Sequence, residues 1–246
     1  MRRSTILLLL LFGCGRAKAP RPAASATRAP ATATHAVATT ATEPAAAVTP
    51  VRGRKIQPVD EASQDPSFVA YRAQLLDAVR RHDRDALLGL IDPKIRTGFD
   101  GGGGTKDFID DWKLDSPDSK LWAELETILT HGGAFSVDEG KRSFWAPYVF
   151  SGTPDDVDAF ESVIVVGAAV PLYDKPSTKS KAIATLEHDV LTGVEGDEVK
   201  GWDQVKTDDG RTGWVEEREV RSPIDYRAGF AKVKGAWKMN TLVAGD

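Results

Sequence analysis

Cysteine and histidine, the residues that catalytic sites often need, are scarce in this chain. Cys14 is the only cysteine, and the histidines are His35, His82, His131 and His188. The histidines lie far apart in the sequence and show neither His-Glu-x-x-His spacing nor any similar spacing of metal ligands. We therefore predict that the protein holds no metal and no cofactor.

Other catalytic arrangements are also missing from the sequence. A thiol nucleophile needs a histidine base beside it, whereas Cys14 stands at the end of an apolar run. No Gly-x-Ser-x-Gly elbow occurs, and residues 101–106 lack the Gly-Lys-Ser/Thr order of a phosphate loop. The acidic residues near Trp112 do not fit a twelve-residue calcium loop; they are Asp110, Asp111, Asp115 and Asp118. We predict that the protein is not an enzyme.

Residues 1–13 have the features of a secretory signal. Arg2 and Arg3 form a cationic head, Leu7–Leu11 an unbroken apolar core, and Gly13 is a small residue at the cleavage point. The apolar run is much shorter than the roughly 20 residues that span a bilayer. We therefore predict export of the chain and no transmembrane helix.

Leu11-Phe12-Gly13-Cys14 closely resembles the lipobox of bacterial lipoproteins. This resemblance implies that the signal is cut before Cys14, that its thiol is diacylated and that the new amino terminus is also acylated. Three acyl chains would exceed the two signals that stable membrane anchoring requires. Since Gly15 rather than Asp follows, the resemblance implies an outer-membrane lipoprotein that faces the periplasm.

Residues 14–65 are predicted to form a disordered tether. They are rich in Ala, Pro and Thr and poor in large apolar side chains, so they cannot bury enough surface to offset the entropy of ordering. Lys and Arg outnumber acidic residues in 15–55, whereas the rest of the mature chain is acidic. The basic charge could contact anionic headgroups or serve solubility alone. The acidic remainder argues against nucleic acid as a partner.

Residues 66–160 are predicted to be the helical part of an α+β domain. Apolar residues recur at helical spacing after helix-starting signals, which are Pro66, Asp83, Thr105 and Ser116. Pro93 should end the second of these helices. Residues 143–150 are then predicted to form a strand.

From residue 162 the pattern changes to short β runs. Turn signals separate these runs, and they are Gly196-Asp197, Lys200-Gly201 and Asp209-Gly210. Short strands between closely spaced turns predict a small antiparallel barrel over residues 161–222.

This segment resembles the bacterial SH3-like (SH3b) domain. The matching features are Val170–Ser177, the strand Trp202–Val205 and the Gly-x-x-Gly-Trp-Val pattern of Gly210–Val215. Leu172 or Tyr173 stands where the family usually has arginine, so a role for that arginine does not carry over. The resemblance implies binding of cell-wall peptides or of envelope proteins, often beside a hydrolase.

Residues 223–246 are predicted to form a β-hairpin with Lys234-Gly235 at its turn. The stretch from Phe230 to Met239 resembles the last strands of nuclear-transport-factor-2-like α+β folds. We favour an architecture in which this hairpin completes the α+β domain and the barrel is inserted before it, since such insertions are tolerated where loop ends lie close. The alternative is a helical domain, a barrel and a loose tail in linear order.

Aromatic residues of the barrel are the predicted binding site, because SH3-like folds recognise ligands through aromatic-lined grooves. The predicted ligand-binding residues are Tyr173, Trp202, Asp203 and Trp214, and a structural role in the core is the alternative for the two tryptophans, which we favour for Trp202. We expect a monomeric, lipid-anchored envelope protein that binds either the peptidoglycan stem peptide or an envelope protein.

A second hypothesis places a small-molecule or enzymatic pocket in the α+β domain. Folds of this class often enclose a pocket between helices and sheet, and His82, Asp83 and Trp112 are the nearby candidates. An interface filled by aromatic side chains would count against it, and the expected filling residues are Phe99, Phe108, Trp122 and Trp145.

Overall fold

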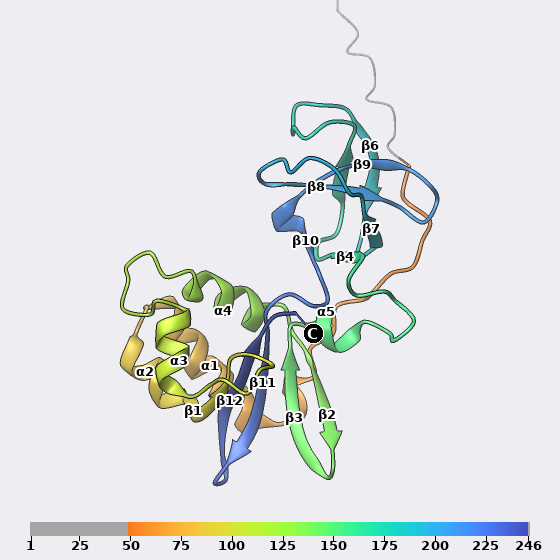
Figure 1. The fold of residues 1–246 in the computed structure, drawn as a ribbon. Helices are drawn as coiled ribbons and strands as arrows, with labels where there is room; N and C mark the ends of the chain where they lie inside the picture. Colours follow the sequence, from red (N-terminus) through yellow and green to blue (C-terminus); the bar gives the residue numbers. More distant parts are fainter. Residues whose placement is uncertain (1–48, 246) are drawn as a thin grey trace, which may run out of the picture. The chain divides into compact units, whose positions relative to one another are not determined.

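The computed structural model describes residues 49–245 (Figure 1). The predicted signal, the predicted acylation site Cys14 and the predicted tether as far as residue 48 lie outside these residues. Helices and sheets are both present, which confirms the α+β class. No helix within residues 49–245 is long and apolar enough to cross a membrane.

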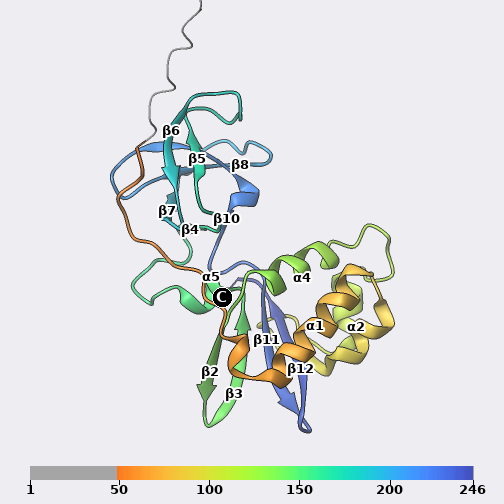
Figure 2. The same ribbon diagram turned by 180° about the vertical axis from the view of Figure 1, so that it is seen from behind.

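One sheet has five strands and is covered by helices, and we call this part the α+β unit. Its strand order is β1 (Ile91–Arg96), β12 (Ala236–Val243), β11 (Arg227–Val233), β3 (Lys141–Ala146) and β2 (Ala134–Asp138). The helices are η1 (Ala62–Gln64), α1 (Pro66–Arg80), α2 (Arg84–Leu90), α3 (Thr105–Asp111), α4 (Leu121–Thr130) and α5 (Tyr148–Gly152). Figures 1 and 2 show α1 to α4 gathered on one side of this sheet.

Helix α1 attaches to the sheet through Phe68. Asp65 caps the helix by accepting hydrogen bonds from the backbone N–H of Ser67 (2.9 Å) and of Phe68 (3.3 Å). The Phe68 ring is fully buried and lies 4.3 Å from the ring centroid of Phe144 and 5.0 Å from that of Trp237. Burying a phenylalanine stabilises a fold by about 1.5–3 kcal/mol, so this aromatic core fixes the helix on the sheet.

The predicted strand over residues 143–150 is only partly correct. Strand β3 ends at Ala146, and Tyr148 begins the short helix α5. Pro147 stands between them and has no N–H to donate to a strand partner, which ends the ladder. The sequence patterns also miss β2 and β1, and β1 contains the Pro93 that was expected to end a helix.

The other sheet is formed by antiparallel strands only, and we call it the all-β unit. Its order is β10 (Val220–Arg221), β4 (Ser162–Val165), β7 (Val190–Gly193), β8 (Trp202–Lys206), β9 (Thr212–Glu216), β5 (Val170–Tyr173) and β6 (Ala182–Leu186), with η2 (Glu217–Glu219) before β10. Fully buried aliphatic side chains such as Leu172, Val205 and Val215 form its core.

Strands β11 and β12 follow the all-β unit in sequence but pair with elements that precede it. They form a hairpin whose turn is Lys234-Gly235, with φ of 51° and 85°. Strand β11 pairs with β3, and β12 runs parallel to β1. The end of the described chain thus completes the five-stranded sheet and is not a loose tail.

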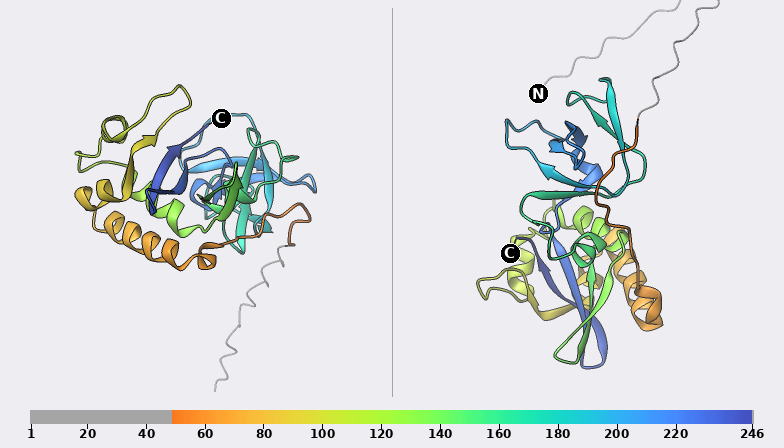
Figure 3. Two further views of the ribbon diagram at one scale, coloured as in Figure 1. Left: turned by 90° about the horizontal axis from the view of Figure 1, so that it is seen from below. Right: turned by 90° about the vertical axis from the view of Figure 1, so that its right-hand side faces the viewer.

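The predicted disordered tether extends too far, because residues 49–65 have defined structure. Residues 49–56, which we call the strap, lie along the all-β unit: Val51 N–H donates to the Thr185 carbonyl, and Ile56 N–H donates to that of His188. The chain then continues to the α+β unit, where Gly133 N–H donates to the Val59 carbonyl (Figure 3). Val51 and Ile56 are each buried, so two apolar anchors offset part of the ordering entropy.

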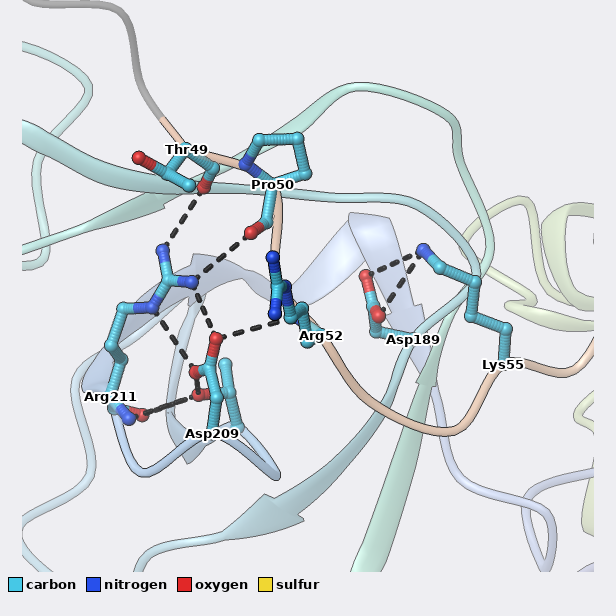
Figure 4. Close-up of polar contacts among 8 residues, drawn as sticks. Thr49, Pro50, Arg52, Lys55, Asp189, Asp209 and Arg211 are labelled. Atoms are coloured by element: carbon cyan, nitrogen blue, oxygen red, sulfur yellow. Dashed lines mark hydrogen bonds and ion pairs between the residues drawn. The ribbon is translucent and has the colours of Figure 1, made fainter.

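Charged groups also hold the strap (Figure 4). The Arg211 guanidinium donates to the carbonyls of Thr49 (3.0 Å) and Pro50 (3.1 Å) and to the Asp209 carboxylate. Asp209 in turn accepts from the Arg52 N–H at 3.3 Å. The Lys55 ammonium forms an ion pair with the buried carboxylate of Asp189. Composition alone could not reveal this order, because the partners lie far away in the sequence.

Candidate functional site

Three aromatic side chains share one face of the all-β unit. Tyr173 on β5 lies opposite Trp214 on β9, and Trp214 lies opposite Gln204 on β8. Trp202 is two residues before Gln204, so side-chain alternation puts it on the same face. The rings of Tyr173 and Trp202 meet edge to face, with centroids 5.6 Å apart and an interplanar angle of 80°.

These rings are neither core residues nor fully exposed. Tyr173, Trp202 and Trp214 are all partly buried, whereas their neighbours Leu172, Val205 and Val215 point into the core. The structure thus brings three of the four predicted ligand-binding residues together. We call them the aromatic face.

Asp203, the fourth predicted residue, points away from the aromatic face. It lies opposite Val215 on the adjoining strand and precedes Gln204, so its side chain projects toward the core side of the sheet. Asp203 nevertheless lines the same cleft as Trp202 and Trp214, so its role in ligand binding stays a prediction.

The loop between β7 and β8 closes over one end of the aromatic face. The Val194 N–H donates to the Gln204 carbonyl (2.9 Å), and the Trp202 N–H donates to the Val199 carbonyl (2.9 Å). Gly201 adopts φ +80°, which lets the chain turn tightly into β8. These bonds hold the acidic stretch 195–198 beside Trp202.

A cleft of about 930 Å³ lies between this loop, the aromatic face and the segment before β4. Trp202, Gln204 and Trp214 line it from the strands, and Phe160, whose side chain is 70% exposed, lines it from the segment before β4. A single exposed apolar side chain is ordinary, but Phe160 lines the same cleft as Trp202 and Trp214, and exposed apolar side chains that gather at one place mark binding sites. The volume is within the range of ligand-binding clefts.

The cleft is strongly acidic. Its acidic lining residues are Glu161, Glu195, Asp197, Glu198, Asp203 and Glu217, and its only basic lining residue is Lys200. None of these carboxylates forms an ion pair with another residue of the described range 49–245. Burial raises the pKa of the Asp203 carboxyl above its ordinary value, and the negative charges of Glu217 and Asp225 raise it further.

Comparison with protein families agrees with this geometry. The sequence model of the family described as bacterial SH3 domain matches residues 166–222. Residues 166–222 are a bacterial SH3 domain. This confirms the resemblance that the sequence motifs indicated for this segment.

Other comparisons add little to the SH3 domain assignment. None of the curated proteins matches the chain. Among solved structures, a designed nuclear-transport-factor-2-like protein matches with 13% identity over 74% of this chain and 100% of its own length. The TM-score of 0.25 is too low to support a statement about the fold, so the predicted resemblance of the α+β unit to that class stays a prediction.

A second hollow, of about 810 Å³, shares Asp203 and Glu217 with the lining of the SH3 domain cleft. Its other lining residues include Glu124, His131 and Arg221. Arg221 donates to Glu124 at 2.6 Å, so a cation and an anion already neutralise each other there. The hollow has no comparable set of aromatic side chains, and the cleft is the better candidate.

The residues of the alternative pocket hypothesis do not converge on one site. His82 stacks on Trp122 with ring centroids 5.0 Å apart, and Asp83 caps α2 by accepting from the Ala86 N–H. Trp112 packs against Tyr226. None of the three lines either hollow described above.

Aromatic side chains fill the helix–sheet interface, although they are not all the expected ones. Phe108 and Trp122 belong to the buried cluster, as predicted. Phe99 is 49% exposed, and Trp145 lies on the opposite face of β3 from the buried Phe144. Phe68, Phe144 and Phe230 occupy the interface in their place.

Sequence reasoning missed the acidic residues of the SH3 domain cleft. Gly196-Asp197 was interpreted only as a turn signal, and Phe160 was assigned no role. The available signal was the acidic composition of 195–198 directly before a tryptophan-led strand.

Proposed function

We propose that the protein is a lipid-anchored, non-catalytic component of the cell envelope whose SH3 domain binds peptides. A bacterial SH3 domain supports an envelope role with peptide or peptidoglycan recognition. The observation that carries the proposal is the cleft in which Trp202 and Trp214 present half-buried rings. The ligand that we propose is the stem peptide of peptidoglycan, with an envelope protein as the alternative source of the peptide.

The geometry explains how such a cleft holds an extended peptide. Aromatic rings offer large contact area at small entropic cost, since each has only two rotatable side-chain bonds. The edge-to-face contact with Tyr173 limits the rotation of Trp202, so the ring is already in position before a ligand arrives. Gln204, on the same face, offers an amide that can donate to and accept from a peptide backbone.

The anchor is the second part of the proposal. Acylation of Cys14 would place the protein at the outer membrane, facing the periplasm, and residues 15–48 would separate the folded part from the bilayer. Replacing Cys14 by Ser (Cys14→Ser) removes the acylated thiol, so we expect the protein to move from the membrane fraction to the soluble fraction with unchanged thermal unfolding. Fractionation of cells that express each form tests this. Persistent membrane association of the variant would contradict the lipid anchor.

Purified peptidoglycan sacculi test the binding function. We expect sacculi to retain the protein on sedimentation, and Trp202→Ala to weaken retention by at least about tenfold, since interface tryptophans often contribute more than 1 kcal/mol. Trp112→Ala, which alters a half-buried tryptophan of the α+β unit, is the matched control and should bind normally. Equal loss in both variants, or no retention of the unaltered protein, would overturn the proposal.

A further inference from the structure

The charge of the cleft restricts which peptide it accepts. Glu195, Asp197 and Glu198 are exposed on the loop that closes the cleft, directly before Lys200. The carboxylates added by other segments are Glu161, Asp203 and Glu217. Negative potential focused in a hollow repels acidic ligands and concentrates cationic ones. The site therefore distinguishes peptides by charge as well as by shape.

These carboxylates are not occupied by partners within the protein. Elsewhere on the same unit, Asp189 is paired with Lys55 and Asp209 with Arg211. In the cleft no acidic side chain has an ion-pair partner among residues 49–245. Crowded like charges destabilise a folded protein, so an unpaired set beside an aromatic hollow is consistent with a site that a cation completes.

The arrangement does not suit a metal ion. Within the described chain, no group of three or more His, Cys, Asp or Glu side chains is placed to hold a metal. The carboxylates instead come from separate segments of the cleft lining. An ammonium group donates up to three hydrogen bonds and needs no fixed coordination geometry, so it can use carboxylates that come from separate segments.

Trp202 and Trp214 supply the second attraction for a cation. The face of an indole ring attracts ammonium groups within about 6 Å, and the attraction increases when the ring is partly desolvated. Both rings are half-buried and line the same hollow as the acidic loop. Aromatic faces and carboxylates are thus the two groups that an organic cation uses, and both lie at this site.

We propose that the cleft selects peptides that carry a free ammonium group, and that in peptidoglycan this group is an amine left unlinked on the stem peptide. The proposal rests on the peptide-binding function proposed above and names the chemical group that the site recognises. A cleft of about 930 Å³ has the size of a site for a small ligand, which favours a short peptide as its occupant.

Acetylation of the ligand tests the proposal directly. Acetic anhydride converts the free amines of purified sacculi into neutral amides and leaves the glycan strands in place. We expect the full-length protein to bind untreated sacculi at least about tenfold more tightly than acetylated sacculi at low salt, because several carboxylate–ammonium interactions are lost together. Raising the salt concentration should reduce this difference.

Neutralising the acidic β7–β8 loop tests the same proposal by changing the protein instead of the ligand. The triple variant Glu195→Gln, Asp197→Asn, Glu198→Gln should bind untreated and acetylated sacculi about equally. The control removes the same number of exposed, unpaired charges from the α+β unit, through Asp111→Asn, Asp138→Asn and Glu139→Gln. That control should keep the preference for untreated sacculi, so a change confined to the loop variant cannot be attributed to net charge.

Each outcome has a distinct meaning. Equal binding of the unaltered protein to untreated and acetylated sacculi overturns the ammonium proposal and leaves peptide binding in place. Binding to neither overturns both.

Discussion

The strap side and the cleft side of the SH3 domain use acidic residues in opposite ways. On the strap side, Asp209 and Asp189 each hold a basic side chain, and Asp208 accepts from the Arg54 N–H at 2.8 Å. On the cleft side, the acidic residues of the β7–β8 loop hold no partner within the described residues. The negative charges of Asp189 and Asp209 on the strap side are therefore neutralised within the protein, whereas those of the β7–β8 loop on the cleft side are not.

The pKa shifts follow this difference. The Arg211 guanidinium and the Thr207 hydroxyl hold the pKa of Asp209 well below its ordinary range. Burial, and then the charges of Glu217 and Asp225, raise the pKa of Asp203. A lowered pKa means that folding favours the carboxylate, and a raised pKa means that folding disfavours it. Asp209 thus contributes to stability at neutral pH, whereas Asp203 opposes it.

Removal of the strap should have the largest effect on stability. A chain that begins at residue 57 loses the buried side chains of Val51 and Ile56, which are each about 5% exposed or less. Each is worth about 1.5–3 kcal/mol, so we expect the free energy of unfolding to fall by about 3 kcal/mol or more. Urea titration of chains that begin at residues 49 and 57 measures this. Equal midpoints would show that the strap is not part of the folded unit.

Thr207→Val should have the next largest effect. The buried Thr207 hydroxyl donates to Asp209 (2.7 Å) and accepts from the Arg211 N–H (3.0 Å). Valine keeps the shape but removes one hydrogen bond to Asp209 and leaves the Arg211 N–H without this acceptor, which costs about 1–3 kcal/mol. Chemical denaturation checks the change, and Thr212→Val, at an exposed position of β9, should alter stability by less than about 0.5 kcal/mol. An equal change in stability for both variants would contradict a structural role for the hydrogen bonds of the Thr207 hydroxyl on the strap side.

Asp203→Asn should have the smallest effect, and with the opposite sign. Removing a carboxylate whose ionisation the fold disfavours should slightly raise stability at pH 7 while it weakens retention by sacculi. Urea midpoints and sedimentation with sacculi measure the two quantities on one preparation. A variant that is less stable at pH 7 would show that Asp203 has a structural partner.

The pH dependence of the same variant provides a sharper test. Because the folded pKa of Asp203 is raised, its contribution becomes unfavourable as pH rises from about 4, the ordinary value, through the raised pKa. The stability gain of Asp203→Asn should therefore be smallest at pH 3 and increase toward pH 7. Denaturation at pH 3, 5 and 7 follows this gain, and a gain that is constant with pH would rule out ionisation as its cause.

Local sequence patterns predicted the elements that depend on interactions between residues close together in the sequence. Pro66 and Asp83 begin helices as expected, Lys234-Gly235 forms the hairpin turn, and the motif of Gly210–Val215 identifies the SH3 domain. Side-chain alternation placed Tyr173, Trp202 and Trp214 on one face only once the strand partners were known.

The features that sequence reasoning missed depend on partners far along the chain. Residues 49–56 become ordered because Thr185, His188 and Arg211 accept or donate their hydrogen bonds, and no local pattern contains that information. Strand β1 forms although it contains Pro93, because it lies at the edge of the sheet beside β12 alone. The direction of the Asp203 side chain could not be predicted, because composition does not give it.

The strap also determines how the protein would respond to tension. The chain from residue 49 is bound along the SH3 domain before it continues to Val59 at the α+β unit. If the proposed lipid anchor holds Cys14 at a membrane, a pull on the chain would load the carbonyls of Thr49 and Pro50, and with them Arg211, before any other contact of residues 49–245. The strap could then detach while the strands that form the aromatic cleft stay in place.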